Sequence, residues 1–301
     1  MSTRFDAAYR GEVVGEVASV IRDNYADREA GEALAEKMTS HIEQGSFESA
    51  SDADGLVTEV MKVIRSSLPD RHFEFTVRSE SRMASHGASQ RKLSPHGLRT
   101  VRMLEHDTAY LEFDGLPGDD ASIKAVAQAL EELPELKAIV FDLRDNIGGS
   151  GDMVALLCSH FLENETLLFT FSGRTGGAPV EVRASAPRRH FGLETPVFVL
   201  TSEATLSAAE AFAYILQDFG RASTVGERTA GMANPSRTFS IGEGFELTVP
   251  FLLMRYGKSG GTYAGSGVEP DIAVPADSAL TVALEGIRRT QVPRTGVSTS
   301  P

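Results

Sequence analysis

The apolar run KAIVFDL at residues 137–143 constrains the fold of this chain more than any other segment. Its apolar side chains follow one another without alternation, which is typical of a strand buried on both faces. The glycine-containing segment DLRDNIGGSGD (142–152) comes next, and GDMVALLCSHFL (151–162) then has an apolar helical pattern. A buried strand, a tight turn and a helix in this order predict an α/β fold.

Strands and helices continue to alternate along the second two thirds of the chain. The patterns predict strands at 108–114, 167–173, 196–202, 222–227, 237–241 and 245–255, and helices at 120–133, 207–219 and 278–289. Earlier in the chain, residues 5–68 carry apolar side chains at three- and four-residue spacing, which predicts helices, and FEFTVR (73–78) alternates like a strand. The polar segment 79–97 has no apolar period and is expected to be a loop or linker.

The chain of 301 residues is long enough for one large domain, or for a small domain and a larger one. We expect an N-terminal helical bundle at 1–70, an α/β core at 71–290 and a flexible tail at 291–301.

Composition excludes some functions. The formal net charge is −13, from 29 basic and 42 acidic side chains, which argues against nucleic acid and anionic membrane surfaces as partners. The sequence has no membrane-spanning run and its N-terminus has no signal-peptide core, so a cytoplasmic location is the default expectation. No phosphate loop, paired cysteines or HExxH motif is present, so no cofactor or metal is expected. The single cysteine, Cys158, lies in an apolar helical pattern and is expected to be buried and inert.

The segment TSEATLSAAEAF (201–212) allows two interpretations of Ser207. Ser207 and Glu210 match the capping box, so these residues alone favour a helix cap. A serine at a helix N-terminus also lies beside the positive end of the helix dipole, with the N–H of Ala208 directed at any charge that forms there. Ser207 is therefore also a candidate nucleophile.

Two further segments are candidate sites. The glycines of DLRDNIGGSGD leave backbone N–H groups uncovered, and such groups bind a developing oxyanion, although this segment taken alone favours a simple tight turn between strand and helix. His72 lies in LPDRHFEF (68–75). It is an ordinary solvated residue unless the fold brings it near Ser207.

The order of four motifs resembles a known family. DLRDNIGGSGD, VLTSEATLSAAEAF, VGERTAGMANP and GSGVEPDIAVP together resemble the C-terminal processing, or tail-specific, serine peptidases over about residues 60–280. The branch they resemble includes the interphotoreceptor retinoid-binding protein modules and the core of tricorn protease. The resemblance implies a crotonase-like β/α core with Ser207 as nucleophile and His72 as general base. It also implies an oxyanion hole formed by the N–H of Ala208 and that of Gly148 or Gly149.

Two residues depart from the family pattern. Met232 occupies the position at which Ser–Lys relatives carry the lysine, and Ala264 the position of the glutamate that supports the histidine in tricorn-like relatives. Loss of an orienting acid lowers the rate of such a site by orders of magnitude. Three hypotheses stay open: a serine hydrolase with a peptide or other acyl substrate, an inactive scaffold that binds an apolar ligand, and a biosynthetic enzyme recruited from this fold. The resemblance also leaves a homo-oligomer open.

Overall fold

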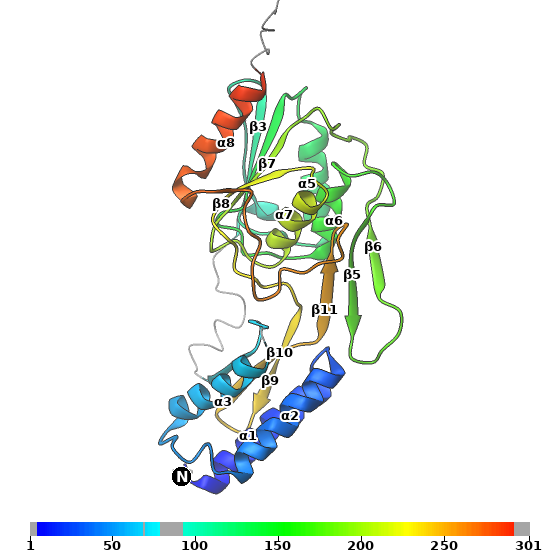
Figure 1. Cartoon of the computed structure of the whole chain (residues 1–301). Coiled ribbons are helices and arrows are strands. Elements are labelled where there is room, and N and C mark those ends of the chain that lie inside the picture. The colour runs from blue at the N-terminus through cyan, green and yellow to red at the C-terminus, as the bar shows by residue number, and fades with distance from the viewer. Residues whose placement is uncertain (1–4, 69, 79–92, 292–301) are drawn as a thin grey trace, which may run out of the picture.

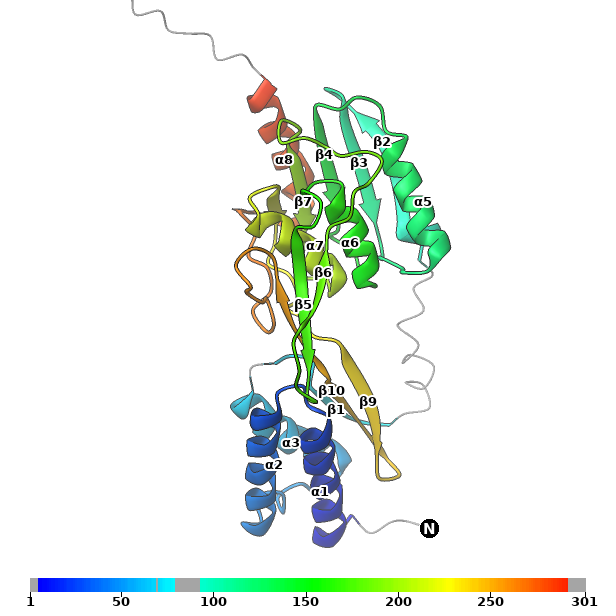
Figure 2. The ribbon, with the colours of Figure 1, turned by 90° about the vertical axis from the view of Figure 1, so that its right-hand side faces the viewer.

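The computed structural model describes residues 5–68, 70–78 and 93–291. Residues 79–92 of the expected loop and 292–301 of the expected tail lie outside the described residues. The molecule is elongated, with an α/β part at one end, a helical part at the other and long strands between them (Figure 1 and Figure 2).

The α/β part is built on a six-stranded sheet of order β12-β8-β7-β4-β3-β2. All neighbours in this sheet are parallel except β2 and β3. The strands are β2 (Leu98–Leu104), β3 (Thr108–Phe113), β4 (Ala138–Asp142), β7 (Val197–Thr201), β8 (Ser223–Gly226) and β12 (Ile272–Ala273). Every residue of β4 and of β7 is buried, which confirms the strand predicted from the continuous apolar run.

Helices cover both faces of this sheet. On one face α5 (Asp120–Glu131), α6 (Gly151–Ser159) and α7 (Ala208–Asp218) share a hydrophobic core with alternate residues of β3 and β4. On the other face α8 (Ala276–Gln291) packs against the intervening residues of the same strands. The predicted α/β class is therefore confirmed. In the described part of the chain no helix is long and apolar enough to cross a membrane.

Several strands were not predicted, and each lacks the signal that sequence patterns detect. β2 is an edge strand with mostly exposed or half-buried residues, β6 (Val180–Arg183) is largely exposed, and β12 has only two residues. The polar segment expected to be a loop ends in a 3₁₀ turn at Pro95–Gly97. A strand that buries neither face has no alternation of apolar and polar residues, so the sequence pattern does not reveal it.

The single strand expected at 245–255 is two strands in different sheets. β10 (Phe245–Pro250) lies between β1 (Glu74–Val77) and β9 (Ser236–Ile241), whereas β11 (Leu252–Tyr256) pairs with β5 (Leu167–Gly173), which in turn pairs with β6. Pro250 stands at the break. Because proline has no N–H and a fixed φ, it ends regular pairing at this point.

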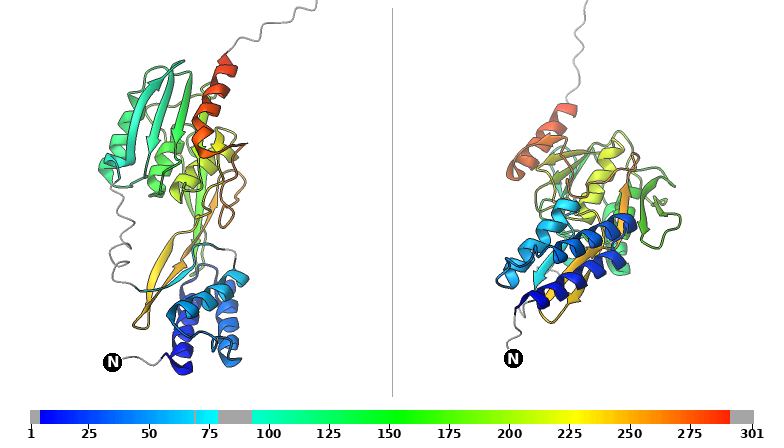
Figure 3. Two further views of the ribbon diagram at one scale, coloured as in Figure 1. Left: turned by 90° about the vertical axis from the view of Figure 1, so that its left-hand side faces the viewer. Right: turned by 60° about the horizontal axis from the view of Figure 1, so that its bottom comes forward.

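The N-terminal helices do not form a core by themselves. α1 (Ala7–Asn24), α2 (Arg28–Glu43) and α3 (Ala53–Ser67) bury their apolar faces against the β1-β10-β9 sheet (Figure 3). The shared core includes Phe75 from β1 and Phe245 from β10, whose rings stack with centroids 5.1 Å apart. Strands from the later part of the chain thus complete the N-terminal unit.

Candidate active site

Ser207 ends the turn between β7 and α7. Its φ of 55° and ψ of −117° place a residue other than glycine in a strained region of conformational space. Strain of this kind persists only where the surroundings fix it. The N–H of Leu206 donates to the carbonyl of Asn146 at 3.0 Å, and the hydroxyl of Tyr263 donates to the carbonyl of Ser207 at 3.0 Å.

Glu210 stabilises this turn through hydrogen bonds to its carboxylate. Its carboxylate is completely buried, and Oε2 accepts the N–H of Ser207 at 2.8 Å and that of Met232 at 2.9 Å. Oε1 accepts the N–H of Gly231 at 2.6 Å and the hydroxyl of Thr229 at 2.5 Å. The glutamate of the predicted capping box therefore also ties the segment 229–232 to the start of α7.

The glycine turn after β4 lies directly against Ser207. Gly148 and Gly149 have φ values of +86° and +153°, and a Cβ on Gly148 would lie 2.8 Å from the Ser207 Cβ. The N–H of Gly148 donates to Asn146 Oδ1 at 2.8 Å, so it is already used. Among the described residues the N–H groups of Gly149 and Ala208 donate no hydrogen bond. These two N–H groups are therefore available to a ligand oxygen.

His72 belongs to a buried hydrogen-bonded group at the junction of the two parts. Its Nδ1 lies 2.6 Å from Asp70 Oδ1, and its exposed fraction is 6% and that of Asp70 is 8%. The Asn234 side chain donates to Asp70 Oδ2 at 2.8 Å, and the Asn234 backbone N–H donates to His72 Nε2 at 3.0 Å. Burial by itself raises the pKa of Asp70, but the hydrogen bonds from His72 and Asn234 outweigh it and hold that pKa below its ordinary value.

Ser207 and His72 line one cavity of about 430 Å³, which the fold forms from segments far apart in the sequence. No hydrogen bond joins Ser207 Oγ to His72 within the described structure, and His72 Nε2 accepts the N–H of Asn234. Catalytic hydrogen bonds are often unformed before substrate binds, so shared access to one cavity is the informative observation.

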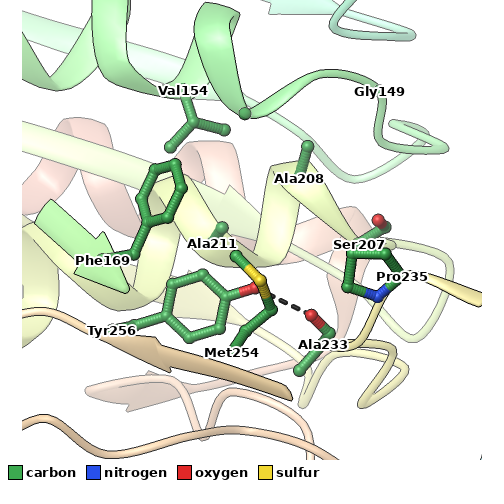
Figure 4. A pocket seen from close by; sticks show the side chains of 11 residues that line it. Gly149, Val154, Phe169, Ser207, Ala208, Ala211, Ala233, Pro235, Met254 and Tyr256 are labelled. Carbon is green, nitrogen blue, oxygen red and sulfur yellow. Dashed lines mark hydrogen bonds between the residues drawn. The ribbon is translucent and has the colours of Figure 1, made fainter. Parts of the chain in front are cut away.

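A second, apolar pocket of about 80 Å³ also has Ser207 in its lining. Figure 4 shows Ser207 at one side of this pocket and Phe169 and Tyr256 at the other. The Tyr256 hydroxyl donates to the carbonyl of Ala233 at 2.8 Å, and burial raises the pKa of this phenol well above its ordinary value. The lining residues are Gly149, Gly151, Val154, Phe169, Ser207, Ala208, Ala211, Ala233, Pro235, Met254 and Tyr256.

The two residues that depart from the family pattern supply no base. Met232 borders the Ser207 cavity, and Ala264 packs against the hydrophobic core. Lys258, the nearest lysine in sequence, is exposed and borders neither the Ser207 cavity nor the apolar pocket. Cys158 is fully buried, as predicted, and burial raises the pKa of its thiol, so it is not an accessible nucleophile.

Sequence reasoning missed Asp70 and Asn234. Asp70 precedes His72 by two residues in DRH, so the sequence alone could have suggested that the carboxylate contacts the imidazole. Asn234 is far from His72 in sequence, and nothing in the segment GMANP indicates the contact. Within the described residues no three His, Cys, Asp or Glu side chains gather as a metal site requires.

A serine on a strained turn at a helix start and a histidine–aspartate pair on the same cavity are the features of a serine-type peptidase. The chain belongs to peptidase family S41. Residues 107–274 match the model of this family, and residues 7–111 match the N-terminal domain of peptidase S41 in eukaryotic IRBP.

Curated relatives carry the names of processing proteases. The carboxy-terminal-processing protease of Bartonella bacilliformis is 30% identical over 154 residues, which cover 51% of this chain and 34% of that protein. The carboxy-terminal processing protease CtpB of Bacillus subtilis is 27% identical over 155 residues, which cover 49% of this chain and 30% of that protein. The chain thus spans about a third of the length of the curated relatives that it matches.

Solved structures share the fold at low sequence identity. A putative peptidase from Parabacteroides merdae aligns with a TM-score of 0.66 and 16% identity over 94% of this chain and 96% of that one. The photosystem II D1 C-terminal processing protease aligns with a TM-score of 0.59 and 15% identity over 93% and 96% of the two chains. Tricorn protease aligns with a TM-score of 0.56 and 11% identity over 94% of this chain and 36% of that one.

Proposed function

We propose that this chain is a serine hydrolase that transfers the acyl group of a peptide-like substrate, with Ser207 as nucleophile and His72 as general base. The observation that carries the proposal is the cavity shared by Ser207 and His72, together with the 2.6 Å contact between His72 Nδ1 and Asp70 Oδ1. Asp70 takes the supporting role that the resemblance assigned to a glutamate at position 264, since it accepts a hydrogen bond from Nδ1–H and leaves Nε2 as the acceptor.

In this proposal His72 Nε2 accepts the hydroxyl proton while Ser207 Oγ attacks the substrate carbonyl carbon. The carbonyl oxygen becomes an oxyanion that the N–H groups of Gly149 and Ala208 bind, and Gly148 shapes the turn that presents them. The bond to the leaving amine then breaks, and His72 returns the proton to that amine. Water repeats the sequence on the acyl-enzyme and regenerates the Ser207 hydroxyl.

Asn234 sets a condition on this mechanism. Its N–H occupies His72 Nε2 at 3.0 Å, and the same nitrogen has to accept the hydroxyl of Ser207. A substrate carbonyl that accepts the Asn234 N–H would release Nε2, so substrate binding and activation of Ser207 are coupled in this proposal. The crotonase-like classification of the core, the cytoplasmic location and assembly into a homo-oligomer remain predictions beside it.

Labelling with a fluorophosphonate tests the proposal directly. We expect one adduct on the wild-type protein and none on Ser207→Ala, because only an activated serine reacts at a useful rate. Ser236→Ala is the matched control: Ser236 borders the same cavity, and this variant should label like the wild type. Intact masses report the adduct. A wild-type protein that stays unlabelled, or an adduct that survives in Ser207→Ala, contradicts the assignment.

The apolar pocket predicts which acyl side chains are accepted. Its volume of about 80 Å³ is smaller than the ~150 Å³ cavity that holds benzene in an engineered protein. We therefore expect N-acetylated alanine and valine thioesters to acylate Ser207 at least about tenfold faster than the phenylalanine thioester, a difference of about 1.4 kcal/mol.

Val154→Ala should reduce this discrimination, since Val154 lines the pocket and is almost fully buried. Val126→Ala is the matched control, because Val126 is equally buried but lies in α5 away from the pocket. Unchanged discrimination in Val154→Ala would show that the side chain binds elsewhere.

A further inference from the structure

A buried asparagine joins the two turns that meet at Ser207. Asn146 is completely buried, and its side-chain amide donates to the carbonyl of Phe113, the last residue of β3, at 3.1 Å. The oxygen of the same amide accepts the N–H of Gly148 at 2.8 Å. The backbone carbonyl of Asn146 accepts the N–H of Leu206 at 3.0 Å. One residue thus connects the end of β3, the glycine turn after β4 and the turn before α7.

The glycine turn depends on such contacts because glycine is the residue with the least restricted backbone. Gly148 has a φ of +86° and is held on both of its sides. Its N–H donates to Asn146 Oδ1, and its carbonyl accepts the N–H of Leu116 at 2.8 Å. The peptide unit that follows is planar and trans, so the Gly149 N–H points away from Leu116. Of the two contacts only that with Asn146 comes from a side chain, so a substitution can remove it.

The two turns lie so close together that this contact also sets their spacing. A Cβ on Gly148 would lie 2.7 Å from the carbonyl oxygen of Leu206 and 3.1 Å from the nitrogen of Ala208. Gly149 and Ala208 both line the apolar pocket beside Ser207 (Figure 4), and neither N–H donates a hydrogen bond within the described residues. A shift of the glycine turn would therefore change the distance between these two N–H groups.

We propose that Asn146 is a positioning residue for the oxyanion hole, and that its side chain holds the glycine turn so that the N–H groups of Gly149 and Ala208 converge on one oxygen. This inference rests on the proposed function, in which that oxygen is the carbonyl oxygen of the substrate. Asn146 does not touch the substrate, because Gly148 and Phe113 occupy its side-chain amide. Its effect on the rate comes from fixing the donors before the reaction begins.

Replacing the carbonyl oxygen of a substrate by sulfur tests this role. N-acetylalanine methyl ester and the corresponding thionoester have the same leaving group, but sulfur is a weak hydrogen-bond acceptor, so the oxygen ester depends far more on the oxyanion hole. We expect the wild-type protein to cleave the oxygen ester at least about 100-fold faster than the thionoester, measured as kcat/KM. Asn146→Ala should lower the rate with the oxygen ester about 30-fold and that with the thionoester less than about threefold, so the ratio of the two rates falls about tenfold. Asn146→Leu, which nearly preserves the side-chain volume, should give the same result if the alanine variant does not fold.

Asn146→Asp should restore the ratio. This variant keeps an oxygen that can accept the Gly148 N–H, and burial favours the protonated form of the new carboxyl, whose O–H can donate to the carbonyl of Phe113. We expect a ratio within about threefold of the wild-type value. A residue that only fills space would not be replaced so specifically.

Thr205→Val is the matched control. Thr205 is also completely buried, its hydroxyl donates to the carbonyl of Leu143 at 2.9 Å, and it accepts the N–H of Ser202 at 2.9 Å. The variant therefore loses two hydrogen bonds in the turn before α7, but neither involves a glycine. It should lower stability to urea and leave the ratio of the two rates unchanged.

Equal losses with both esters in Asn146→Ala, an unchanged ratio, or a ratio that falls as far in Thr205→Val overturns the positioning role. If the wild-type protein cleaves neither ester and Ser207 does not label, the proposed function fails instead, and amide hydrogen exchange then decides the positioning by itself. We expect the Gly148 N–H to exchange at least about tenfold faster in Asn146→Ala than in the wild type, and to regain its protection in Asn146→Asp. Equal exchange in the three proteins shows that Asn146 does not hold the turn.

Discussion

Asp70→Asn is expected to slow acylation of Ser207 on the order of 10⁴-fold, the loss that follows removal of the orienting carboxylate from a serine–histidine–aspartate site. The Asp70 carboxylate accepts the His72 Nδ1–H at 2.6 Å and thereby leaves Nε2 free of a proton. An asparagine amide can donate to Nδ1 instead, which moves the ring proton to Nε2. The rate constant for fluorophosphonate labelling of Ser207, measured at neutral pH, reports the effect.

A double variant separates positioning from simple disruption. His72→Ala removes the proposed base, so adding Asp70→Asn to it should lower the labelling rate no further if Asp70 acts only through His72. Losses that multiply in the double variant would show that Asp70 acts independently of the histidine. Circular dichroism of each variant confirms that the fold is retained.

The lowered pKa of Asp70 adds a signature in stability. The pKa of the Asp70 carboxyl is lower in the folded protein than in the unfolded chain, where it is about 3.9. The ionised carboxylate therefore stabilises the fold at pH values above the unfolded pKa. This contribution is lost as the pH falls through the lowered pKa of the folded protein. Urea unfolding of Asp70→Asn should therefore show less loss of stability on acidification than the wild type.

Glu210→Ala is expected to lower the free energy of unfolding by about 3–5 kcal/mol. The carboxylate is fully buried and accepts four hydrogen bonds, so its removal leaves the donors of Thr229 and Gly231, which are buried, and of Ser207 and Met232, which are half-buried, without this acceptor. Urea unfolding at neutral pH measures the loss. The strained turn at Ser207 loses its support in the same variant, so labelling of Ser207 should fall with stability.

Glu203→Ala is the matched control for this change. Glu203 is an exposed glutamate in the same turn between β7 and α7, and its removal should change stability by no more than about 0.5 kcal/mol. A Glu210→Ala variant as stable as Glu203→Ala would show that the segment 229–232 is held by other contacts.

Parts of the site were readable from local sequence. Ser207 and Glu210 stand three residues apart at a helix start, and the capping pattern predicted their contact, which the hydrogen bond of 2.8 Å from the Ser207 N–H confirms. The glycine turn after β4 was likewise visible. Local sequence did not show that the Asn146 side chain accepts the N–H of Gly148, which leaves the N–H groups of Gly149 and Ala208 for the oxyanion hole that we propose.

The sequence by itself determined the α/β class, the buried strand β4, the helix that starts after Ser207 and the family resemblance, because each depends on side-chain period or on motifs within a few residues. Only the tertiary structure decided that β9 and β10 complete the core of the N-terminal helices and that His72 meets Asn234 beside Ser207. These contacts join segments more than 150 residues apart. They depend on how amphipathic faces pack in three dimensions, and residue spacing along the chain carries no record of that packing.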